Sequence, residues 1–290
     1  MPSPSTPAAH LPFTKMQGCG NDYVYVDGFA HKLADPAQLA QRISDRRFGV
    51  GSDGLILALP SDKADFRMRM WNADGSESEM CGNGLRCVSK FAYDRSLVAR
   101  KPRLTVETGA GVLTVDLGFA AGKVVSATVD MGPPRLERGE LPMAGRAGRV
   151  VDEALAVDGT TLKVTGVSMG NPHVVTYVAK VADAPVLTLG PKVERHASFP
   201  RRTNVHFVEV LSRSEVRQRT WERGSGETHA CGTGACAVAV AGVLTGRTDR
   251  ELTLHLLGGD LAVRWPEGGH VFLSGPCVEV FEGRWPLVAP

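Results

Sequence analysis

Cys81-Gly82-Asn83-Gly84 decides the interpretation of this chain, because the motif occurs again as Cys231-Gly232-Thr233-Gly234. The two cysteines are 231 − 81 = 150 residues apart, and an apolar segment without proline follows each motif. A glycine-rich turn that leads into such a segment predicts the N-terminus of a helix. The first N–H groups there lack intrahelical partners and carry the positive end of the helix dipole. A thiol at this position is biased toward thiolate, and an anion beside it meets ready donors.

Three further loops repeat with the same offset of 150 residues. The pairs are Asn21 and Asn171, Gly54 and Asn204, and Asn72 and Glu222. Polar loop residues that stay in phase over this distance indicate an internal duplication, with two copies of one supersecondary plan. We therefore expect two domains of related fold, each contributing one cysteine motif to a paired site.

The predicted elements indicate an α+β fold. Alternating and β-branched residues predict strands within 13–26, at 54–59 and at 66–72. An amphipathic helix is predicted at 35–48, between the first two of these segments. Asp35 is its expected N-cap and Pro36 its first residue. The segment Ala235–Leu244 is apolar on every side, which indicates burial all round. The expected architecture is two pseudosymmetric domains from an internal duplication, each a curved, mostly antiparallel, barrel-like sheet around a central helix.

The stretch MGPPR at residues 131–135 is the predicted domain boundary. We expect a disordered N-terminal tail at 1–12, a first domain at 13–130 plus 277–290, and a second domain at 131–276. The tail is rich in Pro, Ser and Ala and lacks the basic start and apolar core of a signal peptide. The last predicted strand, within residues 278–288, is left over from the second copy and is expected to return to the first domain.

Composition narrows the function classes. The net charge is +2 over 290 residues, with acids and bases interspersed, so no nucleic acid or membrane partner is expected. The six cysteines are residues 19, 81, 87, 231, 236 and 277. They are too few for a disulfide scaffold, and a reducing, cytoplasmic location is expected. Their spacings differ from the C-x2-C pairs of zinc sites, so no metal is expected.

Several motifs have a structural as well as a functional interpretation. The glycines after each cysteine resemble a dinucleotide fingerprint, but the parallel βαβ unit and the following acidic residue are missing. Asparagines favour turns, and Glu222-Arg223 could be a surface ion pair. The loop positions favour ligand contact, and His173 could influence a thiol. Cys19, Cys87, Cys236 and Cys277 are interpreted as structural.

Two thiols across a symmetric cleft suit a reaction that removes a proton from one face of a carbon and returns it to the other. One thiol begins as thiolate and the other as thiol, so either configuration can be the substrate. The α-hydrogen of an amino acid is weakly acidic, and the carbanionic intermediate needs concentrated stabilisation. Two helix N-termini directed at one carboxylate would supply preorganised donors. No cofactor is implied by any other motif.

The blocks KMQGCGNDYVYVDG, WNADGSESEMCGNGLRC, SMGNPH, RRTNV and ERGSGETHACGTGACA resemble the signature of the diaminopimelate epimerase family, in the family's order, over about residues 13–284. The resemblance implies a cofactor-independent isomerase of the cytoplasm, acting on LL-2,6-diaminopimelate in lysine and peptidoglycan-precursor biosynthesis. It implies that Cys81 and Cys231 are catalytic and that His173 and Glu222 tune the thiols. The implied substrate-binding residues are Asn21, Asn72, Gly82, Asn83, Asn171, Asn204, Glu222, Arg223, Gly232 and Thr233.

Two positions depart from the family pattern. Gly54 stands where some members have a glutamine, which removes that contact, and Phe281 stands where some have a tyrosine associated with dimerisation. A homodimer is still expected. The nearest alternative is a racemase resembling proline racemases, which share the two-cysteine chemistry. A protein that uses Cys81 and Cys231 as a disulfide switch is the alternative from a different class.

Overall fold

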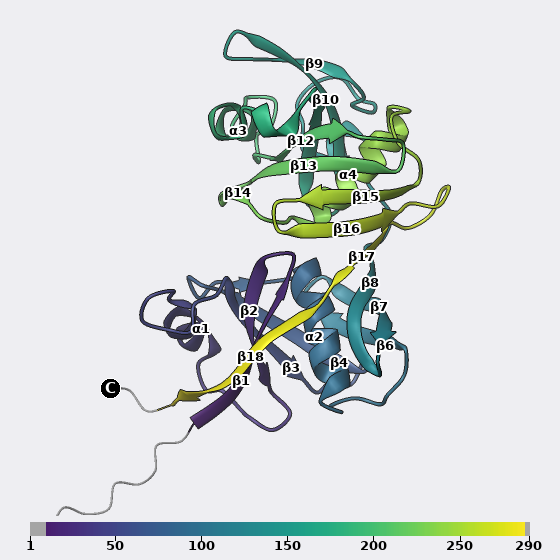
Figure 1. Ribbon diagram of the computed structural model, residues 1–290. Helices are drawn as coiled ribbons and strands as arrows, with labels where there is room; N and C mark the ends of the chain where they lie inside the picture. Colours follow the sequence, from purple (N-terminus) through teal and green to yellow (C-terminus); the bar gives the residue numbers. More distant parts are fainter. Residues whose placement is uncertain (1–9, 288–290) are drawn as a thin grey trace, which may run out of the picture. The chain divides into compact units, whose positions relative to one another are not determined.

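The computed structural model describes residues 10–287, which form two compact units. Unit 1 comprises residues up to Thr128 together with those from Pro276 onward, and unit 2 comprises Val129–Gly275. Figure 1 shows that each unit has its own sheet with a helix packed against it. The units are α+β folds of the same plan, so the predicted fold class is confirmed.

Unit 1 is a mostly antiparallel sheet with two helices. Its elements are β1 His10–Gly18, β2 Asn21–Asp27, α1 Pro36–Ser44, β3 Gly54–Leu59, β4 Phe66–Asn72, β5 Glu77–Ser78, α2 Gly82–Asp94, β6 Arg103–Thr108, β7 Gly111–Ala120, β8 Lys123–Asp130 and β18 Val278–Pro286. The strands pair in the order β18-β1-β2-β3-β4-β6-β7, with β5 also on β4. Only the β2–β3 and β4–β6 pairs in this series are parallel. Asp35 caps α1, since its side chain accepts from the Gln38 N–H at 2.9 Å.

Unit 2 repeats this order. Its elements are the 3-10 helices η1 Arg138–Glu140 and η2 Val181–Asp183, with β9 Glu153–Val157, β10 Thr160–Ser168, β11 Pro172–Tyr177, α3 Val186–Glu194, β12 Asn204–Val210, β13 Glu215–Glu222, β14 Gly226–Thr228, α4 Gly232–Leu244, β15 Glu251–Leu256, β16 Gly259–Arg264 and β17 Phe272–Pro276. Here the pairing order is β9-β10-β11-β12-β13-β15-β16-β17. The parallel pairs are β11–β12 and β13–β15, the counterparts of those in unit 1.

The duplication extends to single residue pairs in the sheets. In unit 1 Tyr23 lies opposite Gly54 on the parallel β2–β3 ladder, and in unit 2 His173 lies opposite Asn204 on the β11–β12 ladder. Both members of the second pair are 150 residues after those of the first. Helices α1 and α3, and α2 and α4, also begin 150 residues apart. After the central helices the offset becomes 148, since β6 begins at Arg103 and β15 at Glu251.

Each central helix is buried, as the apolar pattern of Ala235–Leu244 predicted. Residues 234–242 of α4 and 82–92 of α2 are all buried. Helix α2 carries polar side chains into the interior, and these bond locally: Arg86 donates to the Asn83 Oδ1 at 2.9 Å and Ser89 to the Leu85 carbonyl at 2.8 Å. Buried polar groups that keep such bonds avoid a large desolvation penalty.

The N-terminal strand begins earlier than expected. Residues 10–12, assigned to the tail from sequence, belong to β1, because His10, Leu11 and Pro12 lie opposite Pro286, Trp285 and Arg284 of β18. The sheet partner orders them, and it is distant in sequence. The rest of the predicted tail, 1–9, lies outside the described residues. Strand β18 pairs along β1, so the predicted return of the last strand is confirmed. No helix within residues 10–287 is long and apolar enough to cross a bilayer.

Candidate active site

Cys81 is the N-cap residue of α2 in unit 1. Its backbone is extended, with φ −138° and ψ 120°, and its sulfur accepts from the N–H of Gly84 at 3.4 Å. The thiol also donates to the amide oxygen of Asn21 at 3.4 Å. The sulfur therefore lies between a helix N–H donor and a side-chain acceptor. This arrangement gives Cys81 partners for both protonation states.

Glycine at the fourth residue of each motif leaves room for the side chains packed around the start of the helix. A Cβ on Gly234 would lie 3.1 Å from the Cys231 sulfur and 2.3 Å from Cε1 of His206. A Cβ on Gly84 would lie 2.6 Å from the Ile56 side chain. A side chain at either position would force these neighbours to shift, so packing as well as chemistry favours glycine at the fourth position of the Cys-Gly-x-Gly motif.

Cys231 is the N-cap of α4 in unit 2 and is 5% exposed. Its sulfur lies 3.7 Å from the hydroxyl of Thr233. Burial raises the pKa of this thiol well above its usual value, and the nearby Glu222 carboxylate raises it further. Hydrogen bonds from Thr233 and the Gly234 N–H act in the opposite direction. Glu222 is itself held by the Thr228 hydroxyl, which donates to Oε1 at 2.6 Å.

A buried row of polar side chains lies beside this motif. Asn171 donates to the Thr233 hydroxyl at 3.4 Å, and its amide oxygen lies 3.0 Å from Nε2 of His173. Nδ1 of His173 lies 2.9 Å from Nε2 of His206, whose Nδ1 lies 3.0 Å from the Thr220 hydroxyl. Burial lowers the pKa of His173 well below its usual value and lowers that of His206 to about 3. Both rings are therefore neutral at neutral pH.

Both ends of the Asn204 side-chain amide form hydrogen bonds within unit 2. Its Nδ2 donates to the Pro172 carbonyl at 2.9 Å, and its Oδ1 accepts from the Arg223 N–H at 2.9 Å. These bonds fix the loop that follows β13. The Arg223 guanidinium donates to the Arg201 carbonyl at 3.2 Å and lies on an exposed part of the loop. Asn204 thus orients the backbone that presents Arg223.

Asn72 of β4 lies opposite Gly54 of β3 in unit 1. The Asn72 side chain donates to the Ser76 hydroxyl at 3.0 Å in the turn after β4. A Cβ on Gly54 would lie 2.0 Å from the Trp71 carbonyl oxygen. A glutamine at this position would therefore require a different path of the backbone, so Gly54 is a packing requirement of this chain and not only the loss of a polar group.

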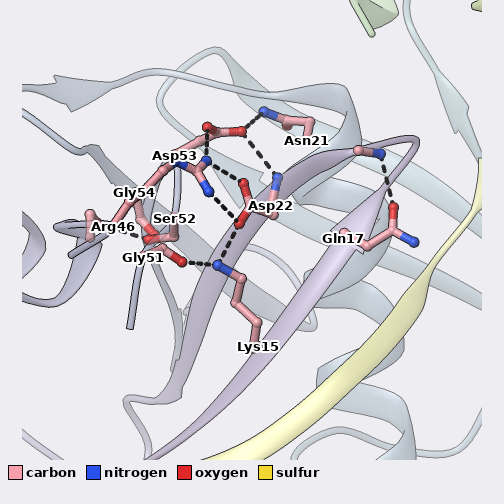
Figure 2. Close-up of polar contacts among 11 residues, drawn as sticks. Lys15, Gln17, Asn21, Asp22, Arg46, Gly51, Ser52, Asp53 and Gly54 are labelled. Carbon is pink, nitrogen blue, oxygen red and sulfur yellow. Dashed lines mark hydrogen bonds and ion pairs between the residues drawn. The ribbon is translucent and has the colours of Figure 1, made fainter. Parts of the chain in front are cut away.

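Asn21 belongs to a polar cluster at the start of β2, shown in Figure 2. Its Nδ2 donates to Oδ2 of Asp53 at 2.7 Å, which leaves its oxygen for Cys81. Arg46 bridges Asp53 and Asp22 at 2.9 and 2.8 Å. Lys15 pairs with Asp22 from the other side. The cluster comes from four places in the sequence and encloses Asn21 on one side.

The other cysteines occupy apolar positions. Cys19, Cys87, Cys236 and Cys277 are at most 3% exposed. Burial raises the pKa of Cys87 to about 11 and that of Cys277 to about 12, so both are protonated at neutral pH. Such thiols are poor nucleophiles and bases. Their structural interpretation agrees with these surroundings.

Within each unit, the structure brings predicted residues together around its cysteine. In unit 1 these are Asn21, Cys81 and the helix residues Gly82 and Asn83, whereas the Asn72 side chain contacts Ser76 in the turn after β4. In unit 2 they are Asn171, His173, Glu222, Cys231, Gly232 and Thr233. Sequence reasoning missed Tyr23, Asp53 and His206. The internal repeat did not point to Asp53 or His206, because the residues that correspond to them at the offset of 150 are Thr203 and Ile56.

The arrangement supplies acid–base chemistry at two helix N-termini. Each thiol is beside the first turn of a buried helix, where N–H groups at 82–83 and 232–233 have no intrahelical acceptor and can hold a carboxylate. Glu222 gives Cys231 a carboxylate that can take its proton. Among residues 10–287 no group of three or more His, Cys, Asp or Glu side chains is placed to hold a metal ion.

Comparison with known proteins gives one consistent family. A model of the family described as diaminopimelate epimerase matches residues 13–137 and 165–280. A protein of this name from Moorella thermoacetica is 54% identical over 95% of this chain and 99% of its own length. One from Desulforudis audaxviator is 56% identical over 95% of this chain and 99% of its own.

Solved structures share the fold at low sequence identity. A Bacillus anthracis protein of the PhzF phenazine biosynthesis family has a TM-score of 0.69 at 19% identity, covering 95% of this chain and 99% of that one. A probable proline racemase from Agrobacterium radiobacter also has a TM-score of 0.69, at 15% identity, covering 96% and 93%. These likenesses concern the fold alone.

Proposed function

The chain belongs to the diaminopimelate epimerase family, and we propose that it converts LL-2,6-diaminopimelate to the meso form with Cys81 and Cys231 as the two acid–base groups. The observation that carries the proposal is that both cysteines cap the N-termini of buried helices at equivalent places in duplicated units. The reaction belongs to lysine and peptidoglycan-precursor biosynthesis. It is an isomerisation that needs no oxidant or reductant.

The chemistry uses one thiolate and one thiol in each direction. The thiolate removes the α-hydrogen as a proton, the electron pair of the C–H bond remains on the substrate, and the other thiol donates its proton to the opposite face of that carbon. The first sulfur ends protonated and the second as thiolate. The roles are exchanged in the reverse reaction, so the net change is inversion at one carbon.

The helix ends stabilise the intermediate. As the proton leaves, negative charge develops on the reacting carboxylate, and the amides of Gly82 and Asn83 and of Gly232 and Thr233 donate to it. Fixed donors of this kind are already oriented when the charge appears. Their removal typically lowers kcat on the order of 100-fold or more. This stabilisation takes the place of an electron-withdrawing cofactor in the proposed reaction.

The remaining polar residues bind the substrate and tune the thiols. Asn21 and Asn171 lie beside the two cysteine motifs, Arg223 binds the distal carboxylate, and Glu222 the distal ammonium. Asn72 and Asn204 complete this set. His173 and Glu222 are the proposed modulators of the thiols, and Glu222 has the direct contact to Cys231.

We also propose a cytoplasmic homodimer that assembles through β18. Three apolar side chains on this strand are solvent-exposed, Val278 at 41%, Val280 at 55% and Phe281 at 46%. Val278 and Val280 lie on one face of the strand, because side chains two residues apart point the same way, and neighbouring exposed apolar groups are typical of a contact surface. Sedimentation of the wild type and of Val280→Lys tests the dimer; an unchanged mass in the variant would contradict this interface.

Incubation with LL-diaminopimelate in deuterated water tests the function. The expected result is meso product that carries deuterium at the inverted carbon, and no deuterium in added proline. Exchange into proline with none into diaminopimelate would assign the chain to the proline racemase class. Absence of exchange into any amino acid would support a thiol switch instead.

A further inference from the structure

The amide of Asn21 is held by groups that its counterpart in unit 2 does not have. The side chain at the position equivalent to Asp53 is Thr203, and its hydroxyl donates locally to the Asn204 carbonyl at 3.2 Å. The counterpart asparagine, Asn171, instead contacts His173 and Thr233. The two half-sites therefore share their backbone plan and differ in what fixes their asparagines.

Asp53 is itself firmly placed. Its N–H donates to the Asp22 carbonyl at 2.7 Å, and its carbonyl accepts from the Ala73 N–H at 2.9 Å. Its carboxylate accepts from Arg46 at 2.9 Å and from the Asp22 N–H at 3.1 Å, as well as from Asn21 (Figure 2). A side chain with this many bonds stays in one conformation, so it can orient its neighbour.

The chemistry of the carboxylate decides the direction of the Asn21 amide. A carboxylate accepts hydrogen bonds and does not donate them, so only the NH2 end of Asn21 can face Asp53. The oxygen end then faces the Cys81 sulfur, where it accepts the S–H at 3.4 Å. An amide turned the other way would present N–H groups to the sulfur, and these would favour thiolate.

We propose that Asp53 is a positioning residue that holds Asn21 with its amide oxygen toward Cys81 and thereby keeps the proton on that sulfur until substrate binds. This inference rests on the proposed function only in giving Cys81 an acid–base role. It assigns Asp53 a function although it touches neither thiol directly. Arg46 and Lys15 support it by balancing the charges of Asp53 and Asp22.

Other ionisable groups also surround Cys81, and the experiment must separate them from Asp53. Tyr23 and Tyr25 face it from β2, and Cys87 and Arg86 lie further along α2. Burial raises the pKa of Tyr23 well above its usual value, so its hydroxyl is neutral. Tyr23 also hydrogen-bonds to Asn21 and to Cys81, so Asn21→Ala removes a contact of Tyr23 as well. A double-mutant cycle therefore compares the effect of Asp53→Ala with and without Asn21, and the difference between the two measures the coupling of Asp53 to Asn21.

The cycle compares wild type, Asp53→Ala, Asn21→Ala and the double variant. The measured quantity is the rate of Cys81 alkylation by iodoacetamide, without substrate, from pH 6 to 10, quantified by peptide mass spectrometry. Asp53→Ala should move the midpoint of this profile down by about one pH unit, the order expected when one oriented hydrogen bond is lost. In the Asn21→Ala background it should move the midpoint much less.

Asp116→Ala is the matched control, because Asp116 pairs with Arg103 at 2.5 Å on the surface of the same unit. It should leave the midpoint unchanged. If Asp53→Ala does not fold, Asp53→Asn keeps the shape and should show a smaller shift in the same direction. A wild-type midpoint in a folded Asp53 variant would overturn the proposal, as would an equal shift with and without Asn21. The proposed function is tested separately by wild-type exchange on diaminopimelate.

Discussion

Burial of Cys231 and the carboxylate of Glu222, which hydrogen-bonds to its thiol, together hold the pKa of that thiol well above its usual value. Cys231 is therefore protonated at neutral pH until Glu222 or a bound substrate changes its surroundings. The carboxylate has two effects: its charge opposes a second negative charge on sulfur, and it can accept the proton when the thiol must act as a base.

Glu222→Gln should lower the pKa of Cys231, because the neutral amide no longer opposes the thiolate. The thiolate would then appear at a lower pH than in the wild type, although burial would still keep the pKa raised. Catalysis should fall on the order of 100-fold, since the proton acceptor is lost. Alkylation of Cys231 against pH and exchange on diaminopimelate measure the two effects.

The control for this change is Glu227→Gln. Glu227 lies on the adjacent β14 and pairs with Arg219 at 2.7 Å. It should leave both the alkylation profile and the exchange rate near wild type. Equal effects of the two substitutions would show that general charge, and not the contact with Cys231, is responsible.

The buried histidines predict a dependence of stability on pH. The pKa of His206 is lowered from 6.5 to about 3, so between these values the unfolded chain binds a proton that the folded chain does not. Its contribution to stability is fully present above pH 6.5 and is lost as the pH falls toward 3. Between pH 7.5 and 5.0 the loss from this residue should be about 2 kcal/mol.

Denaturant unfolding of wild type and His206→Gln at both pH values measures this term. The variant should lose about 2 kcal/mol less than the wild type over the same interval. A wild-type pH dependence in His206→Gln would contradict neutral burial of this ring.

The proposed role of Arg223 predicts substrate specificity. Lysine keeps the distal amine of diaminopimelate and lacks the distal carboxylate, so it would leave Arg223 without its anion and should be a very poor substrate. Arg223→Ala should lose most activity on diaminopimelate and narrow the gap to lysine. The quantity to compare is kcat/KM for both substrates, with the exposed Arg213→Ala as control. Efficient racemisation of lysine by the wild type would contradict the proposal that Arg223 binds the distal carboxylate.

Much of the fold could be predicted because the duplication is visible in sequence. The offset of 150 between Cys81 and Cys231 also relates Tyr23–Gly54 to His173–Asn204 on the two parallel ladders. The very short β5 and β14 were not predicted, since two or three residues show no alternation. β1 was predicted too short because its first residues are ordered by β18, at the other end of the chain.

Candidate site residues were selected from sequence at loop positions that the repeat and the family resemblance mark, whereas Asp53 and His206 were missed. At the offset of 150 residues, Asp53 corresponds to Thr203 and His206 to Ile56. Neither pair repeats a polar residue type that would have drawn attention to it. Their importance depends on contacts from distant parts of the sequence, Asp53 to Asn21 and His206 to His173. A side chain that acts through another leaves no motif of its own.

The central claim is that Cys81 and Cys231 are the two acid–base groups, and epimerisation of LL-diaminopimelate by single cysteine variants tests it most directly. Cys81→Ala and Cys231→Ala should each lose at least about a thousandfold in rate, because residues that act as a unit fail together. Cys87→Ala and Cys236→Ala should retain activity and lose about 1–2 kcal/mol of stability from the core. Wild-type epimerisation by Cys81→Ala or by Cys231→Ala would contradict the account.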